Sequence, residues 1–440
     1  MKKTTKKSLQ FKAISGKKII ADFNGGEITS DAGLLFLREI ESNIGIIKDV
    51  AGVLPDTRHQ GYIKHSMMEM LTQRVFQIAA GYEDANDSNT LRHDPVLKLA
   101  CNRLDEALAG QSTMTRFENG FGILTQYRIA KAFVDSFIRS YKNPPKAIML
   151  DIDDTEDKTH GSQQLSLFNG YHKSYCYMPI HIYEGKSGKL IATILRPGKR
   201  PSGKEALAIL KRIIRLIREA WPEVGILLRG DSHYAFKEVM DYCENSNIAY
   251  IFGLTTQQPM EKRAASRQKK AGELYYLENN PVKLFGEFMY QAGSWRQARR
   301  VIFKAEHNEK GSNLRFIVTN LENQNIPMVY SKIYCGRGEM ELFIKEHKNH
   351  LFSGRTSCSS FIANQFRLFL HSIAYVLLHA LREKCLQKTP FAKAQFDTIR
   401  LKILKIGARI VLMSTKVKIH LPTAFPYQDD LYQLWQCCVT

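Results

Sequence analysis

The sequence predicts an α/β protein with a mostly helical N-terminal region. Three observations lead to this prediction. Apolar residues recur at helical spacing before Pro144-Pro145, short alternating strands and an amphipathic helix follow this pair, and a β-rich, basic block occupies residues 255–327. Helical periodicity then returns, so the strands are concentrated in the middle of the chain.

Residues 1–141 are the predicted helical region. A basic segment is followed by the turn Asn24-Gly25-Gly26, and Thr29-Ser30-Asp31 precedes an apolar run, which is typical of a capped helix start. Another helix is indicated by Met67, Met70, Leu71, Val75 and Ile78. We expect this region to bind DNA. A helix-turn-helix and a plain helical packing domain fit the pattern equally well, and the sequence does not indicate a recognition helix.

Residues 142–254 are expected to begin the α/β core. A strand is predicted at 147–153, and two more at 177–183 and 189–195 are joined by a glycine-containing turn as a hairpin. An amphipathic helix at 205–221 and a short apolar strand at 226–228 follow. Acidic residues end the first and last of these strands, and strand ends are where ligands gather in α/β sheets.

Residues 255–327 are expected to form a β-rich insertion. Strands are predicted at 299–304 and 314–319, a cluster of positive charge lies at 262–270, and Trp295 is assigned to core packing. Residues 328–420 are expected to be helical, and 421–440 to form an irregular tail. The most apolar stretch, 368–381, is too short and too polar to span a membrane, so it predicts a buried core helix.

Charge and cysteine usage restrict the class of partner. Lys and Arg total 63 against 43 acidic residues, which gives a formal net charge of +20. Such a surplus attracts polyanions, most commonly nucleic acid, although a ribosome-associated or simply basic protein has the same charge. The eight cysteines include no Cys-x-x-Cys pair, which argues against a zinc ribbon and fits a reducing cytoplasm. No apolar segment follows the basic N-terminus, so no signal peptide is expected.

The strongest chemical pattern is YCGRGEMELFIKEHK, which starts at Tyr334. As a helix it places one carboxylate among cations in a single stripe, made of Tyr334, Arg337, Glu341, Lys345 and Lys348. Because its two glycines are poor helix formers, Tyr334 and Arg337 are expected just before the first full turn. A solvated, salt-bridged helix face has the same pattern. The other interpretation is a metal-binding Glu341 flanked by phosphate-binding cations.

Further acids end two predicted strands. In LDIDDTED, Asp151 and Asp153 share one face, whereas Asp154 points the other way or begins the loop. Asp231 ends the apolar strand of LLRGD. Both motifs have an explanation without function: a surface loop for LDIDDTED and an ordinary strand-to-loop turn for LLRGD. Three converging carboxylates suit two Mg²⁺ ions, which prefer oxygen ligands and can activate a nucleophile and neutralise charge at phosphorus.

Taken together, these motifs resemble those of bacterial insertion-sequence DDE transposases. The Tyr-x2-Arg-x3-Glu-x6-Lys spacing resembles the signature of one branch, and Asp153-Asp154-Thr155 resembles its first acidic motif. Five further segments are similar to that branch: DFNGGEITSDAGLLFLRE at 22–39, THGSQ at 159–163, FNGYHKSYCYMP at 168–179, LRGDSHYA at 228–235 and LRFIVTNL at 314–321. The resemblance covers nearly the whole chain.

The resemblance implies a ribonuclease-H-like catalytic core interrupted by the β-rich insertion. It also implies that two Mg²⁺ ions, which Mn²⁺ can replace, are held by Asp153, Asp231 and Glu341, with Asp151 and Asp154 as alternatives to Asp153. By the same resemblance, Tyr334, Arg337 and Lys348 contact DNA at the cleaved end, and Lys345 is assigned with them.

The implied activity is cut-and-paste DNA transposition. The protein is expected to cleave the terminal inverted repeats and to join them to target DNA, as a homodimer on paired ends. Two other functions fit the same residues: a ribonuclease-H-like nuclease that cleaves without strand transfer, and a catalytically inactive DNA-binding relative. The presence of all three acids argues against the inactive relative. We expect a cytoplasmic protein with no membrane association.

Overall fold

The chain is divided into two compact units. A computed structural model describes residues 8–322 and 324–439. One unit comprises Met1–Gly120 together with Ile373–Thr440, and the other comprises Phe121–Ser372. The first unit is therefore assembled from both ends of the chain, whereas the second is one continuous segment.

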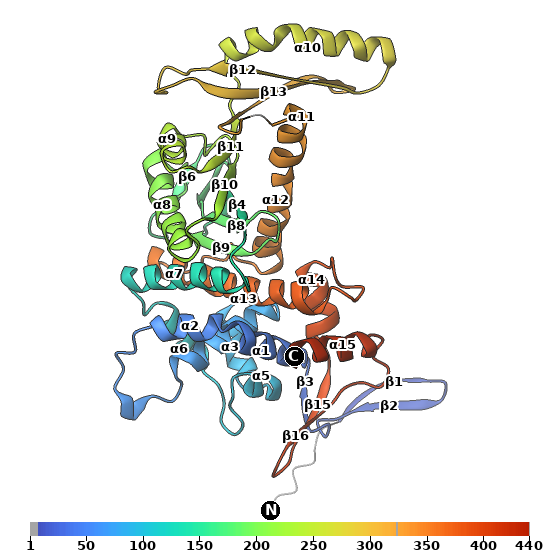
Figure 1. The fold of residues 1–440 in the computed structure, drawn as a ribbon. Helices are drawn as coiled ribbons and strands as arrows, with labels where there is room; N and C mark the ends of the chain where they lie inside the picture. The colour runs from blue at the N-terminus through green and yellow to red at the C-terminus, as the bar shows by residue number, and fades with distance from the viewer. Residues whose placement is uncertain (1–7, 323, 440) are drawn as a thin grey trace, which may run out of the picture. The chain divides into compact units, whose positions relative to one another are not determined.

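An eight-stranded mixed sheet is the centre of the unit Phe121–Ser372 (Figure 1). Its strand order is β12-β13-β14-β11-β10-β4-β8-β9, in which β10 pairs in parallel with both β4 and β11 and all other neighbours are antiparallel. The strands are β4 (Ala147–Asp154), β8 (Ile180–Glu184), β9 (Leu190–Ile194), β10 (Gly225–Gly230), β11 (Ala249–Leu254), β12 (Val282–Tyr290), β13 (Arg299–Asn308) and β14 (Gly311–Thr319).

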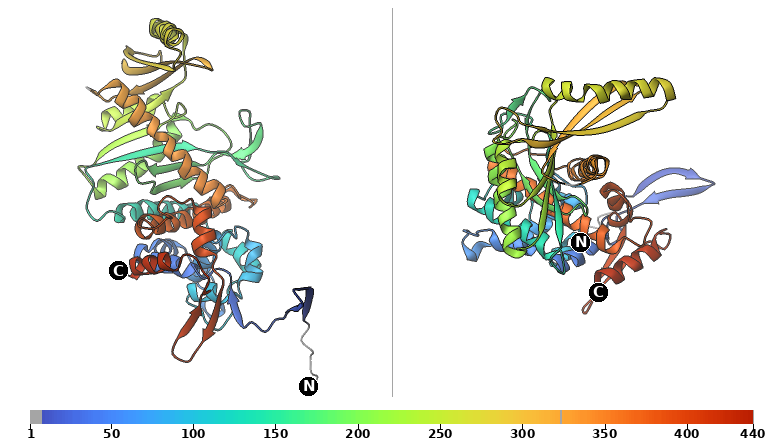
Figure 2. Two further views of the ribbon diagram at one scale, coloured as in Figure 1. Left: turned by 90° about the vertical axis from the view of Figure 1, so that its right-hand side faces the viewer. Right: turned by 45° about the horizontal axis from the view of Figure 1, so that its top comes forward.

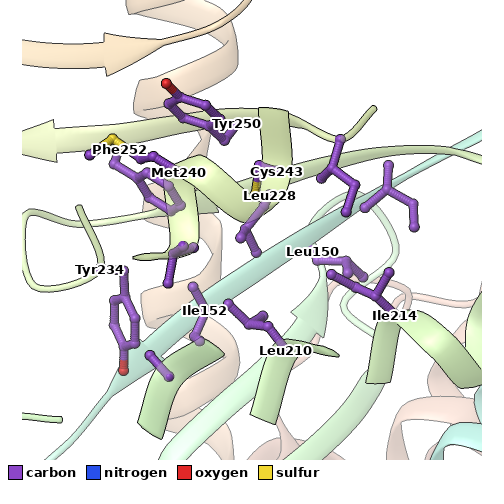
Figure 3. Close-up of a cluster of buried hydrophobic side chains, with 14 of the residues drawn as sticks. Leu150, Ile152, Leu210, Ile214, Leu228, Tyr234, Met240, Cys243, Tyr250 and Phe252 are labelled. Carbon is purple, nitrogen blue, oxygen red and sulfur yellow. The ribbon is translucent and has the colours of Figure 1, made fainter. Parts of the chain in front are cut away.

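Helix α8 (Gly203–Ala220) covers the part of the sheet that holds β4 and β10. It begins with a capping box between Ser202 and Glu205, in which each side chain accepts a hydrogen bond from the other's backbone N–H. Its apolar residues then recur at helical spacing, so one face is buried. Figure 3 shows that face, with Leu210 and Ile214, near Leu150 of β4. Each large apolar side chain buried in this way contributes about 1.5–3 kcal/mol.

The predicted strands at 147–153 and 226–228 are confirmed as β4 and β10, and the predicted helix at 205–221 as α8. The predicted strand at 177–183 is two strands, β7 (Ser174–Tyr177) and β8, because Pro179 lacks the N–H that a continuous ladder needs. β7 belongs to a separate small sheet in the order β5-β7-β6, with β5 (Asp157–Lys158) and β6 (Leu167–Asn169).

The block at 255–327 is less purely β than expected. Helix α10 (Gln258–Glu278) carries the predicted cluster of positive charge, and strands β12, β13 and β14 extend the central sheet. The sequence did not reveal α10 because only Met260, Ala264 and Ala271 are buried on it, too few for clear periodicity. Trp295 is buried, as predicted, with its ring edge-on to Tyr290.

Residues 326–350 form one helical run, which Figure 2 shows as a single rod. It is built from α11 (Ile326–Met328), η3 (Val329–Tyr334), η4 (Cys335–Arg337), α12 (Gly338–Lys345) and η5 (Glu346–His350), with wider π-helical turns in η3 and η5. The prediction that Tyr334 and Arg337 precede the first turn is therefore wrong. Val329 and Tyr330 are buried before the glycines and Met340 after them, so packing on both sides holds the helix through them.

Helices α7 (Ile123–Arg139) and α9 (Lys237–Asn245) also belong to this unit. Helix α13 (Phe361–Ala380) crosses its boundary at Ser372. Only the segment Phe361–Cys385, among the described residues, is long and apolar enough to cross a membrane, and 83% of its most apolar window is buried. This agrees with the predicted buried core helix at 368–381.

The other unit is mostly helical, as predicted for its N-terminal part. Its helices are α1 (Leu34–Ile44), α2 (Ile46–Val53), α3 (Met67–Ala79), α4 (Ser88–Leu91), α5 (Pro95–Ala100), α6 (Gln111–Glu118), α14 (Phe396–Ile399) and α15 (Gln428–Val439). The expectation of an irregular tail at 421–440 is wrong for the residues of α15. A hairpin of β1 (Leu9–Ile14) and β2 (Lys17–Ala21) completes the N-terminal part.

A three-stranded sheet joins the two ends of the chain within this unit. Its order is β16-β15-β3, with β3 (Glu27–Thr29), β15 (Ala408–Leu412) and β16 (Val417–His420). A Cβ on Gly33 would lie 1.9 Å from the Ile403 carbonyl oxygen, so only glycine permits this approach. The expected side-chain cap of α1 is absent: Gly33 is the N-cap, and Asp31 instead accepts hydrogen bonds from Tyr82 and Lys405.

Candidate active site

The parallel register of β4 and β10 brings two of the predicted acids together. Asp151 lies opposite Arg229, and Ile152 lies opposite Gly230. The next residues along the two strands are Asp153 and Asp231, and side chains at matching positions of paired strands point to the same face. Two acids that are 78 positions apart in the sequence therefore lie at the same edge of the sheet.

Asp151 is taken up by an ion pair and is not available as a ligand. Its two carboxylate oxygens accept hydrogen bonds of 2.6 and 2.5 Å from the guanidinium of Arg229. The Asp151 side chain is 0% exposed and that of Arg229 is 3% exposed. Of the two alternatives to Asp153, this pairing leaves Asp154.

Arg337 links the strand acids to the helix acid. Its Nη1 donates a hydrogen bond of 2.7 Å to Asp153 Oδ2, and its Nη2 lies 3.5 Å from Glu341 Oε1, one helical turn away. Burial acts to lower the pKa of Arg337, but the nearby negative charges, that of Asp153 most and that of Asp231 among them, raise it. Arg337 thus contacts Asp153 and Glu341 directly, and it lies close enough to Asp231 to interact with its charge.

Burial, together with the charges of Asp231 and Asp154, raises the pKa of Asp153 to about 7, although Arg337 acts to lower it. Asp154 Oδ2 is buried and has no hydrogen-bond partner among the described residues. One arginine therefore faces more negative charge than it can neutralise, so the geometry favours an additional cation.

These acids fit a divalent cation by their chemistry. The donors are carboxylate oxygens, which Mg²⁺ prefers. Within residues 8–322 and 324–439, however, no group of three or more His, Cys, Asp or Glu is gathered closely enough to hold a metal ion. Glu341 is 66% exposed and Arg337 stands beside it, so ion binding requires Arg337 and Glu341 to move.

Tyr334 reaches the same place from the helical run. A Cβ on Gly253, in β11, would lie 2.7 Å from the Tyr334 hydroxyl oxygen and 3.0 Å from the Ser232 backbone nitrogen. Gly253 therefore leaves room for the phenol beside the loop that carries Asp231. Burial raises the pKa of Tyr334, so the hydroxyl stays protonated and can donate a hydrogen bond.

The two predicted lysines differ in their surroundings. Lys348 donates hydrogen bonds to the Glu156 carbonyl and, at 3.4 Å, to the Thr155 hydroxyl, and so fixes the loop after β4. Lys345 is exposed one turn after Glu341. The structure thus brings Tyr334 and Arg337 to the acids, ties Lys348 to the adjacent loop and leaves Lys345 facing solvent.

His233 is near the site and was missed in the sequence. Its Nδ1 lies 3.7 Å from Asp154 Oδ1 and 3.9 Å from Asp231 Oδ2. The interaction with Asp154 raises the pKa of His233, and the charge of Asp231 raises it as well. Burial acts in the opposite direction, because it disfavours the charged imidazolium. Its position two residues after Asp231 was the available signal.

Asp157 provides a test of the electrostatics beside the site. It is fully buried with neither oxygen hydrogen-bonded among the described residues, and burial raises its pKa to about 7 against the lowering effect of Lys348. The folded chain therefore holds a proton that the unfolded chain releases near pH 4, so stability from this group is lost as the pH rises towards 7. Asp157→Asn should remove that loss and stabilise the protein at pH 8 by on the order of 3 kcal/mol.

Chemical unfolding of wild type and Asp157→Asn at pH 5 and pH 8 measures this effect. The exposed Asp105→Asn is the control, because it makes the same change without burial. An equal response of Asp105→Asn and Asp157→Asn to pH contradicts the role given to burial.

Comparison with known proteins gives the family. No curated protein matches the sequence. Among solved structures, the chain is similar to that described as the piggyBac transposase synaptic complex with hairpin DNA, at 10% identity and a TM-score of 0.44 over 86% of this chain and 80% of that chain. The family described as Transposase DDE domain group 1 matches residues 11–438. Because that match spans almost the entire sequence, the protein belongs to this family of DDE transposases.

Proposed function

We propose that the protein cleaves the ends of a mobile DNA element and joins them to target DNA, with Mg²⁺ held by Asp153, Asp231 and Glu341. The observation that carries this proposal is the convergence of these three acids on Arg337 from two strands and a helix. A cluster of acids with too few cations suits a site whose substrate and cofactor bring the missing positive charge and the phosphate.

The central sheet supports a ribonuclease-H-like core. Five of its strands have the order β9-β8-β4-β10-β11, with β4, β10 and β11 parallel. The first acid lies on the middle strand and the second follows the strand next to it. In this proposal the core comprises residues 142–254 and 328–420, the insertion residues 255–327, the DNA-binding region residues 1–141 and the tail 421–440.

Each side chain has a role in the proposed reaction. Bound Mg²⁺ would supply a nucleophilic water at neutral pH and neutralise charge at phosphorus. Arg337 would exchange its bond with Asp153 for a bidentate bond to a DNA phosphate, since phosphate and carboxylate accept the same fork of donors. Tyr334 would donate its hydroxyl to the same strand, Lys345 would contact a phosphate, and Lys348 would hold the loop after β4.

Paired DNA ends are the proposed substrate, bound by a homodimer. The net charge of +20 favours phosphate contacts along the DNA, with base-edge contacts supplying the specificity for inverted repeats. Mn²⁺ is expected to substitute for Mg²⁺, because it also accepts carboxylate and water ligands.

Strand transfer separates this proposal from a nuclease. Pre-cleaved element ends with free 3′-hydroxyls are mixed with supercoiled plasmid, protein and Mg²⁺, and joined products are sought on a gel. A transposase yields covalently joined ends, whereas plasmid nicking without joined product contradicts the proposed reaction.

Arg337→Gln should separate metal binding from DNA cleavage. Removing the guanidinium frees Asp153, so affinity for Mn²⁺ without DNA should rise about tenfold, the effect of losing one competing charged hydrogen bond. Cleavage of DNA ends should fall, because a phosphate contact is lost. Thermal midpoints across a Mn²⁺ titration report the affinity.

Lys345→Gln is the matched control for Arg337→Gln. It removes the same charge from the same helical run at an exposed position, whereas Arg337 is the residue that bonds to Asp153. If the two variants gain equal Mn²⁺ affinity, only net charge matters, and the competition between Arg337 and metal is contradicted.

A further inference from the structure

Three large aromatic side chains are exposed on the small sheet that follows the first acid and on the turn between two of its strands. We name residues 157–177, which contain β5, β6 and β7, the aromatic flap. Phe168, Tyr171 and Tyr175 are 58%, 88% and 61% exposed. Aromatic side chains of this size dominate binding energetics, and a concentration of them on a polar surface marks an interaction site.

The aromatic flap holds these rings in defined positions. Phe168 and Tyr175 are cross-strand partners of β6 and β7, with ring centroids 5.5 Å apart in an edge-on arrangement. Asn169 Oδ1 accepts hydrogen bonds from the backbone N–H groups of Tyr171 and His172, which fixes the turn that carries Tyr171. A Cβ on Gly198 would lie 2.3 Å from the Cys176 carbonyl oxygen, so the chain packs closely under the flap.

The charge around the rings is positive. Lys158, Lys173 and Lys199 are exposed beside the strands of the flap, and Arg200 donates to the carbonyl oxygens of Ser232 and His233, next to Asp231. The nearest acids face inwards: Asp157 is buried, and Glu156 accepts a hydrogen bond from the Ser174 hydroxyl. Exposed rings with cations between them complement a polyanion that also carries flat bases.

The aromatic flap is continuous with the candidate active site. Glu156 lies three residues after Asp153, so their Cα atoms are separated by about 11 Å at most. His172, next to Tyr171, lies 3.8 Å from Glu156, whose carbonyl accepts from Lys348. Since DNA rises about 3.4 Å per nucleotide, a ligand held by the flap lies within a few nucleotides of a phosphate at Asp153.

We propose that the aromatic flap binds unpaired nucleobases of the DNA strand near the cleaved phosphate, by stacking on Phe168, Tyr171 and Tyr175. Paired bases inside a duplex have no free face, so the rings select a single-stranded or frayed end. The lysines contact the backbone on either side. This inference rests on the proposed function for its substrate, and it assigns the flap a binding role distinct from the chemistry of the three acids.

Single-stranded DNA binding tests this proposal without cleavage. Fluorescence anisotropy of labelled dT15, in EDTA, gives the affinity of the full chain whatever the state of the metal site. Tyr171→Ala and Phe168→Ala should each weaken binding of dT15 by about five- to hundredfold, the effect of losing one stacked base, and should affect binding of a blunt 15-base-pair duplex much less. Tyr171→Trp should retain the affinity, because it keeps an aromatic face.

Tyr432→Ala is the matched control. Tyr432 is 68% exposed on α15, whose first turn carries Asp429 and Asp430, so it should leave dT15 binding unchanged. Wild-type affinity of Tyr171→Ala for dT15 overturns the proposal, as does equal weakening by Tyr171→Ala and Tyr171→Trp. A flap variant that alters only self-association, measured by sedimentation, also overturns it and makes the flap a contact between copies of the chain.

The outcomes separate this proposal from the proposed function. Loss of dT15 binding in Tyr171→Ala, together with unchanged end cleavage in Glu341→Gln, supports the flap and contradicts the catalytic assignment. The opposite pair of results keeps the catalytic assignment and removes the flap.

Discussion

Asp231→Asn and Glu341→Gln should each reduce cleavage of a DNA end by at least about 10³-fold without weakening DNA binding. Each change replaces a charged oxygen ligand with a neutral amide of the same shape, so the proposed ions lose affinity and transition-state charge loses several kcal/mol of stabilisation. DNA binding should persist because removal of a negative charge does not repel phosphate. Gel assays of cleavage and anisotropy on the same DNA measure the two effects.

Glu339→Gln is the control for these variants. Glu339 is exposed two residues before Glu341 on the same helix, so it undergoes the same change of charge while pointing away from the acids. Cleavage by Glu339→Gln should match that of wild type. Unaltered cleavage by both Asp231→Asn and Glu341→Gln contradicts the proposed site.

Arg229→Met should be strongly destabilising. Arg229 and Asp151 form a buried ion pair, and removal of one partner leaves the other without compensation inside the sheet. The expected loss in free energy of unfolding is about 3–5 kcal/mol, measured by urea unfolding of the full chain. Loss of activity alone would not establish this, because the same strands carry Asp153 and Asp231.

The double variant Asp151→Leu/Arg229→Met should recover most of this loss. With both charges absent, no buried charge is left unpaired, and only the Ile333 carbonyl loses its hydrogen bond from Arg229. Arg215→Ala, which breaks an exposed pair with Glu219 at 3.5 Å, should leave unfolding almost unchanged. A double variant as unstable as Arg229→Met contradicts the account of the pair.

The strands and the helix around the predicted acids could be predicted because their patterns are local. The alternation of apolar and polar residues in β4 and the regular apolar face of α8 each lie within a segment of fewer than 20 residues. The choice among Asp151, Asp153 and Asp154 was not local. It depends on the register of β4 against β10, which pairs Asp151 with Arg229, and nothing near Asp151 indicates a partner 78 residues away.

Features dictated by tertiary packing could not be predicted. Helix α10 buries only small residues and one methionine, so its periodicity is weak. The helical run through Gly336 and Gly338 contradicts their intrinsic propensity, which burial on both sides overrides. The bond from Arg337 to Asp153 joins residues 184 positions apart, and its sequence signal, a cation one turn before Glu341, suggested only a phosphate contact.

The pairing of β3 with β15 has a consequence for synthesis on the ribosome. Thr29 pairs with Ala408, and Gly33 fits against residues 403 and 404. At about 5–20 residues per second, the partner strand emerges roughly 20–80 s after β3 is made. The continuous unit Phe121–Ser372 can fold during that interval, whereas the unit that contains β3 must wait until β15 has been made. Translation that stops before residue 408 therefore yields a chain in which β3 lacks its partner strand β15.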